Sequence, residues 1–448
     1  MCVPIVFSIF FLLSIFPNRM PCPYQPTASR LTRLPTDGWL TSSSVGGTSP
    51  RSVRARAAVA RTMPQADGDP PHGTYYSDYL KLDQMLELQE PLSVQDDGSF
   101  VHEELLFITV HQSHELWFKL IIADLSRVHK IMSQAVLAAD PFAPPAETDL
   151  AKAIASLERV KAIQPMLQQK LAVLETMTPM EFLEFRDYLV PASGFQSWQF
   201  RIIEILLGLS TQNRGNMSHE YMKRKLRLED YEKVVLWESQ PSLQDLTETW
   251  LEHMPWLRAP GNGDKVNFDW MREYKEAVYQ LLQSEEDTMR AVFAELHMDE
   301  KLLEEELQQV MSNRATFNSL FEIEQHKEMV DRGVRKFSQK AIINAIFAFL
   351  YRDLTALHSP FRFLTLLVEI DDGFTSWRYR HAQMAHRMIG RKMGTGATTG
   401  ADHLLRVAQQ NSSFKDLRNL STFLIPYSKM PPLPPGVLSV LRHDSPMA

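Results

Sequence analysis

The sequence predicts an all-α protein, and three observations carry that prediction. From Tyr75 to about Leu424, apolar residues recur at every third or fourth position, which is the period of an amphipathic helix. Alternating strand patterns bounded by hairpin signals are nearly absent, and the cluster from Pro260 to Gly263 is typical of a surface loop. The chain has 448 residues, of which 44% are hydrophobic, so it can bury a sizeable core.

Several helices are predicted in chain order within a domain of residues 63–430. After a first helical stretch at 79–86, the clearest periodic segments are Leu105 to Leu125, Leu150 to Leu174, Phe195 to Leu209 and Phe374 to Met388. Proline-containing breaks are expected at Asp140 to Glu147 and at Pro255 to Gly263. The highly charged stretch at about 215–330 predicts a solvent-facing helical insertion. The proline-rich tail, residues 431–448, is expected to be extended.

The first 62 residues differ in composition from the rest. They contain seven arginines and no lysine, balanced only by Asp37. The apolar run from Val3 to Phe16 is too short for a spanning helix and resembles a signal-peptide core, although it lacks a basic start. An arginine-rich, acid-poor stretch is also typical of a transit peptide. A third interpretation, which we favour, is upstream sequence with true initiation at Met63.

Composition excludes several classes of function. Lys+Arg 47 against Asp+Glu 54 gives a net charge of −7 without a basic stripe, which argues against nucleic-acid binding through phosphates. Both cysteines, Cys2 and Cys22, lie in the first 22 residues. The rest of the chain therefore has no disulfide, iron–sulfur cluster or thiolate nucleophile, and metal chemistry there must use histidine or carboxylates. We expect a small-molecule ligand and neither a nucleic-acid nor a membrane partner.

The predicted helix at Phe374 to Met388 has an aromatic and apolar face that contains a histidine. Phe374, Trp377, His381, Met384 and Met388 share that face by their spacing. A histidine in such a stripe is usually a core residue bonded to a backbone carbonyl. The alternative is an axial haem ligand, because haem takes one imidazole in an apolar pocket.

A second helix carries Phe107-Ile108-Thr109-Val110-His111-Gln112-Ser113-His114-Glu115, in which His111 and His114 share a face. The order His-x-x-His-Glu is neither His-Glu-x-x-His nor His-x-x-Glu-His, and no third ligand cluster with convincing spacing accompanies it. A polar residue in an aromatic pocket therefore fits His111 better than a zinc ligand.

Two further segments contain candidate polar contacts. Arg186 lies four residues after Phe182, and it is either a surface ion-pair partner of Asp187 or Glu184 or a bidentate clamp for a ligand carboxylate. Ser193 and Gln196 form an S-x-x-Q capping box that would start the helix running to Leu209. The Gly394 to Gly400 stretch is a flexible connector or a loop that folds over a ligand.

Taken in order, these motifs resemble the tryptophan 2,3-dioxygenase family over about residues 72–430. The resemblance rests on Tyr75-Tyr76-Ser77-Asp78-Tyr79-Leu80, Phe107 to Gln112, Phe185 to Leu189, Pro191 to Ser197, Trp377-Arg378-Tyr379-Arg380-His381, Gly394-Thr395-Gly396 and Asn419 to Pro426. This chain departs from the family pattern at Ala397, Thr398 and Thr399, at Arg380 where asparagine is common, and at His403.

The resemblance implies a helical haem-binding dioxygenase fold, a cytoplasmic homotetramer and one haem b per subunit. It implies insertion of both atoms of O2 into the indole C2–C3 bond of L-tryptophan, giving N-formyl-L-kynurenine, the first step of tryptophan catabolism by the kynurenine pathway. The alternative is a haem-based sensor or a tryptophan-binding protein without turnover.

The resemblance also implies roles for individual residues. His381 would be the axial ligand of the haem iron, with Trp377, Ser193 and Gly194 also in contact with the cofactor. His111 and Ser193 would be the catalytic residues. Substrate contacts would come from Phe107, Ile108, Thr109, Val110, His111, Phe182, Arg186 and Thr395, and from Tyr76, Tyr79 and Leu80 of a neighbouring subunit.

Overall fold

The computed structural model describes residues 74–137, 147–209, 219–254, 269–297, 299–390, 392, 394, 404–406, 408 and 411–442. Every regular element in these residues is helical, which confirms the all-α prediction for this part of the chain. None of the helices in the described ranges is long and apolar enough to cross a membrane. The chain divides into two compact units, residues 1–79 and 80–448.

The α-helices that carry the fold are α1 (Tyr76–Leu80), α2 (Leu82–Met85), α3 (His102–Val136), α4 (Glu147–Leu174), α5 (Pro179–Phe185), α6 (Trp198–Leu207), α7 (His219–Lys225), α8 (Leu228–Glu238), α9 (Leu243–His253), α10 (Trp270–Glu295), α11 (Glu300–Phe321), α12 (Ile323–Asp331), α13 (Gln339–Leu350), α14 (Thr355–Ile389), α16 (Lys415–Arg418) and α17 (Pro435–Arg442). Short 3-10 helices are η1 (Arg186–Leu189), η2 (Gly194–Gln196), η5 (Asn419–Phe423) and η6 (Tyr427–Lys429).

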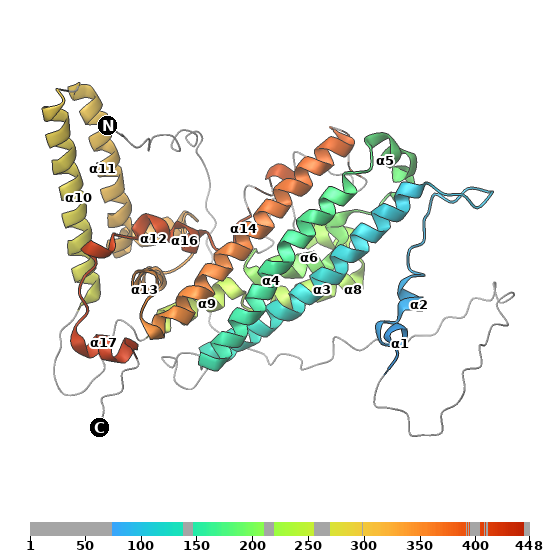
Figure 1. Ribbon diagram of the computed structural model, residues 1–448, viewed down its shortest axis with the longest axis horizontal. Helices are drawn as coiled ribbons and strands as arrows, with labels where there is room; N and C mark the ends of the chain where they lie inside the picture. Colours follow the sequence, from blue (N-terminus) through green and yellow to red (C-terminus); the bar gives the residue numbers. More distant parts are fainter. Residues whose placement is uncertain are drawn as a thin grey trace, which may run out of the picture. The chain divides into compact units, whose positions relative to one another are not determined.

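Three long helices, α3, α4 and α14, form the centre of the second unit, with α4 packed against both of the others (Figure 1). Their facing sides follow the helical period. Ile121, Leu125 and Val128 of α3 and Leu157 and Val160 of α4 are all fully buried. On the outer sides of α3, helices α6 and α9 complete the core.

Helix α14 is longer than the stretch predicted from Phe374 to Met388. It runs for 35 residues and continues through Pro360. Its first half buries Leu357, Phe363 and Leu367 completely. This burial stabilises the helix despite the proline. The stretch that contains His381 is therefore the C-terminal part of one continuous helix.

Helices α4 and α14 approach closely at Gly373. The side-chain amide of Gln164 on α4 donates a 2.7 Å hydrogen bond to the carbonyl of Ile370 on α14. A Cβ at position 373 would overlap the Gln164 side chain. Only glycine leaves room for the amide at this crossing.

The prediction of a solvent-facing insertion at about 215–330 is wrong for part of that range. Helix α9 buries Leu243, Leu246, Trp250 and Leu251 against α3 and α13, and α8 packs against α6. Each of these helices has one apolar face, which the many charged residues of the stretch made difficult to recognise in the sequence. Helices α10 and α11, by contrast, pair mainly with each other and carry many exposed side chains.

The proline-rich tail is also not extended throughout. Residues Pro435–Arg442 form α17, because a proline in the first turn needs no hydrogen bond from its nitrogen. Val437 and Leu441, four residues apart, are buried on one face of this helix. Residues 1–62, 255–263, 443–448 and most of the break at 140–147 lie outside the described residues.

Candidate active site

His381 lies on the face of α14 that the sequence predicted. Its ring is half-buried and stacks on Trp377, with 5.4 Å between ring centroids and an interplanar angle of 5°. Burial lowers the pKa of His381 to about 4, and the nearby His111 and His114 lower it further in the same direction. The imidazole is therefore neutral at pH 7. No described residue forms a hydrogen bond with either ring nitrogen.

Trp377 connects His381 to two other helices. Its ring lies 5.0 Å from that of Phe200 on α6 and 6.1 Å from that of His114 on α3. Its indole nitrogen is buried without a hydrogen-bond partner among the described residues. The surroundings of His381 on this side are aromatic.

His111 on α3 has a defined hydrogen-bond geometry. Its Nδ1 lies 2.7 Å from the carbonyl oxygen of Phe107, and because a carbonyl accepts, Nδ1 carries the proton and Nε2 holds the lone pair. Burial lowers the pKa of His111, partly offset by that hydrogen bond and by the charge of Glu115. The side chain of His111 is nevertheless exposed, so its ring can be reached by a ligand. A neutral acceptor nitrogen is thus available to a ligand.

The three residues between Phe107 and His111 differ in how deeply their side chains are buried. Val110 is buried in the apolar cluster that joins α3, α4, α5 and α14, and Ile108 is half-buried. Thr109 is exposed, and its hydroxyl donates to the Leu105 carbonyl of its own helix at 2.8 Å. The structure does not bring Thr109 into the aromatic group.

Helix α5 brings two phenylalanines to Phe107. The centroid distances are 5.8 Å from Phe107 to Phe182 and 5.6 Å from Phe107 to Phe185. Two rings that hold an indole between them need about 7 Å, twice the optimal carbon–carbon contact. Phe107 and Phe182 therefore contact each other here, and they must separate to enclose a third ring.

Phe185 was not singled out as a site residue by sequence reasoning. It is fully buried and contacts both Phe107 and Phe182. Its spacing of three from Phe182 is the signal that places both rings on one helical side.

Arg186 follows α5 directly and begins η1. Its side chain is 14% exposed, and its Nε lies 3.9 Å from an oxygen of Asp187, which is 93% exposed. A surface ion pair with Asp187 was one of the two explanations we predicted for Arg186. That pair is present only at the outer limit of ion-pair distance. A guanidinium that directly follows the helix of Phe182 and Phe185 is suited to a carboxylate on an aromatic ligand.

Ser193 and Gln196 form the predicted capping box, but it starts η2 rather than the long helix. The hydroxyl oxygen of Ser193 accepts from Phe195 N at 3.3 Å. A second serine, Ser197, caps α6, which ends at Leu207 and not at Leu209. A Cβ on Gly194 would meet no atom within 4 Å, so this turn has open space beside it.

Some predicted site residues are not brought together by the structure. Thr395 lies outside the described residues. Tyr76 and Tyr79, 74% and 73% exposed, belong to the unit of residues 1–79, and Leu80, at the start of the second unit, is 40% exposed. From the other predicted site residues we select six, and we call them the aromatic–histidine cluster: Phe107, His111, Phe182, Arg186, Trp377 and His381.

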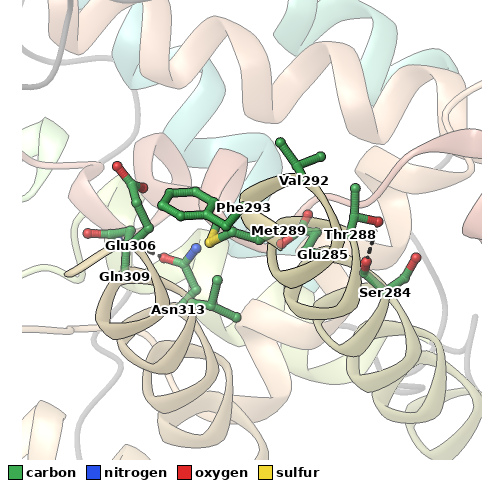
Figure 2. A pocket seen from close by; sticks show the side chains of 10 residues that line it. Ser284, Glu285, Thr288, Met289, Val292, Phe293, Glu306, Gln309 and Asn313 are labelled. Atoms are coloured by element: carbon green, nitrogen blue, oxygen red, sulfur yellow. Dashed lines mark hydrogen bonds between the residues drawn. The ribbon is translucent and has the colours of Figure 1, made fainter. Parts of the chain in front are cut away.

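The described residues offer no group of three or more His, Cys, Asp or Glu side chains that could hold a metal ion. A hollow of about 480 Å³ lies on the α10–α11 pair, lined by residues such as Glu285, Val292 and Glu306 (Figure 2). No histidine or cation lines it. None of the residues of the aromatic–histidine cluster lines this hollow.

Comparison with known proteins identifies the family of this chain. The family model described as tryptophan 2,3-dioxygenase matches residues 62–424. The chain is 38% identical to a tryptophan 2,3-dioxygenase of Dictyostelium discoideum over 365 residues, which cover 81% of this chain and 86% of that protein. It is 36% identical to one of Alteromonas mediterranea, over 81% of this chain and 95% of that protein, and 36% identical to one of Xenopus laevis, over 82% and 86%. The chain belongs to the tryptophan 2,3-dioxygenase family.

Proposed function

We propose that this protein is a haem-dependent dioxygenase that oxidises L-tryptophan with O2 to N-formyl-L-kynurenine, the first step of the kynurenine pathway. The observation that carries the proposal is that the neutral imidazole of His381 lies near His111 of α3, while Phe107, Phe182 and Trp377 pack on one apolar cluster shared by α3, α5 and α14. Membership of the family supports the same reaction.

The residues around His381 fit a haem. Haem iron takes a single neutral imidazole as an axial ligand, and a pKa of about 4 keeps His381 unprotonated. Trp377 and the buried Met384 and Met388 provide the apolar surroundings that such a macrocycle requires. A haem held by His381 would supply the O2 activation that the reaction requires. Ser193 and Gly194, with open space beside the turn, would lie at the haem edge.

Substrate placement is the task of α3 and α5. Phe107 and Phe182 would contact the indole ring, with Val110 and Ile108 beside it, and Arg186 would bind the carboxylate through charge-assisted hydrogen bonds. Correct placement of the C2–C3 bond contributes up to ~7–11 kcal/mol to catalysis in favourable cases. Thr395 and Thr109 remain predicted substrate contacts.

His111 would accept a hydrogen bond from the indole N–H through Nε2. An indole N–H is a very weak acid, whereas burial holds the pKa of His111 below its ordinary value, so removal of that proton from free indole would be steeply unfavourable. The ring nitrogen becomes acidic only after it has gained positive charge during oxidation. His111 therefore orients the ring first and accepts the proton later.

We further propose a homotetramer in which each N-terminal segment completes a neighbour's site. Leu86, Leu88, Leu92 and Val94 are between 54% and 68% exposed, an unusual run for a surface that faces water. Tyr76, Tyr79 and Leu80 immediately precede this run and are also exposed. A cytoplasmic location stays a prediction.

The test is to express the chain from Met63, load it with haem and follow formylkynurenine formation and O2 consumption with L-tryptophan. We expect stoichiometric turnover, and a soluble tetramer without residues 1–62. Tight tryptophan binding to the ferrous protein without O2 consumption would favour a sensor, and absence of a Soret band after loading would overturn the haem assignment.

A further inference from the structure

A charged contact joins the helix that carries His381 to the turn before α5. The guanidinium of Arg380 forms an ion pair with the carboxylate of Glu175. Glu175 directly follows α4, whose last residue is Leu174, and α5 begins four residues later at Pro179. The Arg380 side chain is 43% exposed and that of Glu175 is 13% exposed, so the pair lies at the edge of the protein, partly shielded from water.

Helix α5 needs such a contact because it is short. It has seven residues, and Phe185 of α5, with Met177 just before the helix, belongs to the same apolar cluster as Met384 and Met388 of α14. Apolar contacts are non-directional and specify position weakly. An ion pair between a guanidinium and a carboxylate has a defined geometry. It therefore fixes the position along α14 of the turn that precedes α5.

We propose that Arg380 is a positioning residue for the reaction. Its ion pair with Glu175 sets the distance of α5, and with it Phe182 and Arg186, from His381. Arg380 itself need not touch substrate or haem. The inference rests on the proposed function, because it assigns a consequence for tryptophan binding to a contact outside the binding residues.

The chain contains a matched control. Arg362 of α14 pairs with Glu158 of α4 at 3.0 Å, and their side chains are 36% and 49% exposed. This pair has the same chemistry and joins the same helix to α4. It lies 18 residues from Arg380, about 27 Å along α14 at 1.5 Å per residue. Any effect of a general loss of α4–α14 pairing should appear in both pairs.

The experiment compares Arg380→Gln with Arg362→Gln in the haem-loaded full chain. For Arg380→Gln at low salt, we expect KM to rise ~2–5-fold for both tryptophan and tryptamine, with kcat and the Soret spectrum unchanged. Both substrates are affected because α5 carries the ring contact as well as the carboxylate contact. The difference from the unmodified protein should shrink as salt is added, because the pair is partly exposed. Arg362→Gln should leave both KM values unchanged.

A second measurement does not depend on turnover. Hydrogen–deuterium exchange without substrate should be faster across residues 175–189 in Arg380→Gln and unchanged there in Arg362→Gln. Glu175→Gln should reproduce the effect, and the double substitution Arg380→Glu with Glu175→Arg should restore most of the lost affinity.

Unchanged KM and exchange in Arg380→Gln would overturn the proposal, and so would an equal rise in KM in Arg362→Gln. Failure of the proposed function would appear differently, as absence of tryptophan turnover in the unmodified protein. The exchange comparison would then still decide whether Arg380 positions α5.

Discussion

The aromatic–histidine cluster and the α10–α11 pair differ in how their residues are assembled. The α10–α11 pair contains a hollow of about 480 Å³, formed by two helices that are adjacent in the chain. The cluster is built from α3, α5 and α14, whose residues are separated by up to 274 positions, from Phe107 to His381. Space alone is a poor indicator of function here. The candidate site is distinguished by its composition: aromatic rings, two histidines and a guanidinium come from helical segments that are far apart in the chain.

Substitution of His381, the proposed haem ligand, should have the largest effect and is the strongest test of the comparison. His381→Ala should lose haem while it keeps its helical content, because alanine is favoured in a helix. Soret absorbance and far-ultraviolet circular dichroism measure the two properties. The matched control is His386→Ala on the exposed side of the same helix, which should keep its haem. An unchanged Soret spectrum in His381→Ala would place the ligand elsewhere.

His111→Ala should lower kcat by less than the upper end of the ~10²–10⁴ range for positioned acid–base groups, and weaken tryptophan binding as well. The physical reason is the proposed role of His111, which would orient the indole before it accepts a proton. Steady-state turnover of the haem-replete variant is the measurement. Complete loss of turnover with normal haem and tryptophan occupancy would show that His111 is an obligatory base.

Arg186→Leu should impair tryptophan far more than tryptamine, which lacks the carboxylate. Loss of a charged hydrogen bond costs ~1.5–3 kcal/mol, about a 10- to 150-fold loss of kcat/KM for tryptophan. The ratio of kcat/KM values for the two substrates measures this selectivity. Equal losses on both would contradict the carboxylate role and leave Arg186 with its ion pair to Asp187.

Glu248 on α9 shows that a shifted pKa away from the cluster need not mark a site. Burial raises the pKa of Glu248 to about 7, opposed by the hydrogen bond from Ser338 N at 2.7 Å. The folded protein therefore holds this proton more tightly than the unfolded chain does, and stability is lost as pH rises from about 4.5 to about 7.

Glu248→Gln replaces the titrating carboxyl with a neutral amide, so it should remove the loss of stability at higher pH. We expect the protein to be more stable above pH 7 by about 1–2 kcal/mol, after allowance for partial exposure. Unfolding by urea at pH 5 and pH 8 measures it, and KM for tryptophan should not change. A variant no more stable than the parent at pH 8 would contradict this account.

The smallest effect is expected on the α10–α11 pair. Val292, which lines the hollow, is 42% exposed. Val292→Ser should leave tryptophan turnover unchanged and alter stability by less than about 0.5 kcal/mol. A severalfold change in kcat/KM would break the comparison, because it would show that the hollow is coupled to the cluster.

Periodicity was sufficient to predict the all-α class and the existence of the helices around Leu105 to Leu125 and Leu150 to Leu174. It was insufficient where tertiary packing overrides local signals. Pro360 suggests a helix end, yet α14 continues through it because its neighbours are buried. The charges of α8 and α9 suggested solvent exposure, although each helix hides one apolar face.

The candidate site shows the same division. His381, His111 and Arg186 were identifiable from residue type and motif, and the stacking of Trp377 on His381 follows from their spacing of four. The direct contact of Phe107 with Phe182 and the pairing of Arg380 with Glu175 were not, because they depend on how α5 packs against distant helices. The ordinary alternatives for Ser193 and Arg186 were also partly right, since one is a cap and the other does approach Asp187.

The crossing at Gly373 has a consequence for how this chain can change over evolutionary time. A larger residue at 373 would collide with Gln164, and eight residues, about 12 Å, farther along α14 lies His381. A larger residue at 373 alone would push the two helices apart and tilt His381, the proposed haem ligand. Positions 164 and 373 should therefore covary among relatives, with any gain of volume at 373 matched by a shorter side chain at 164.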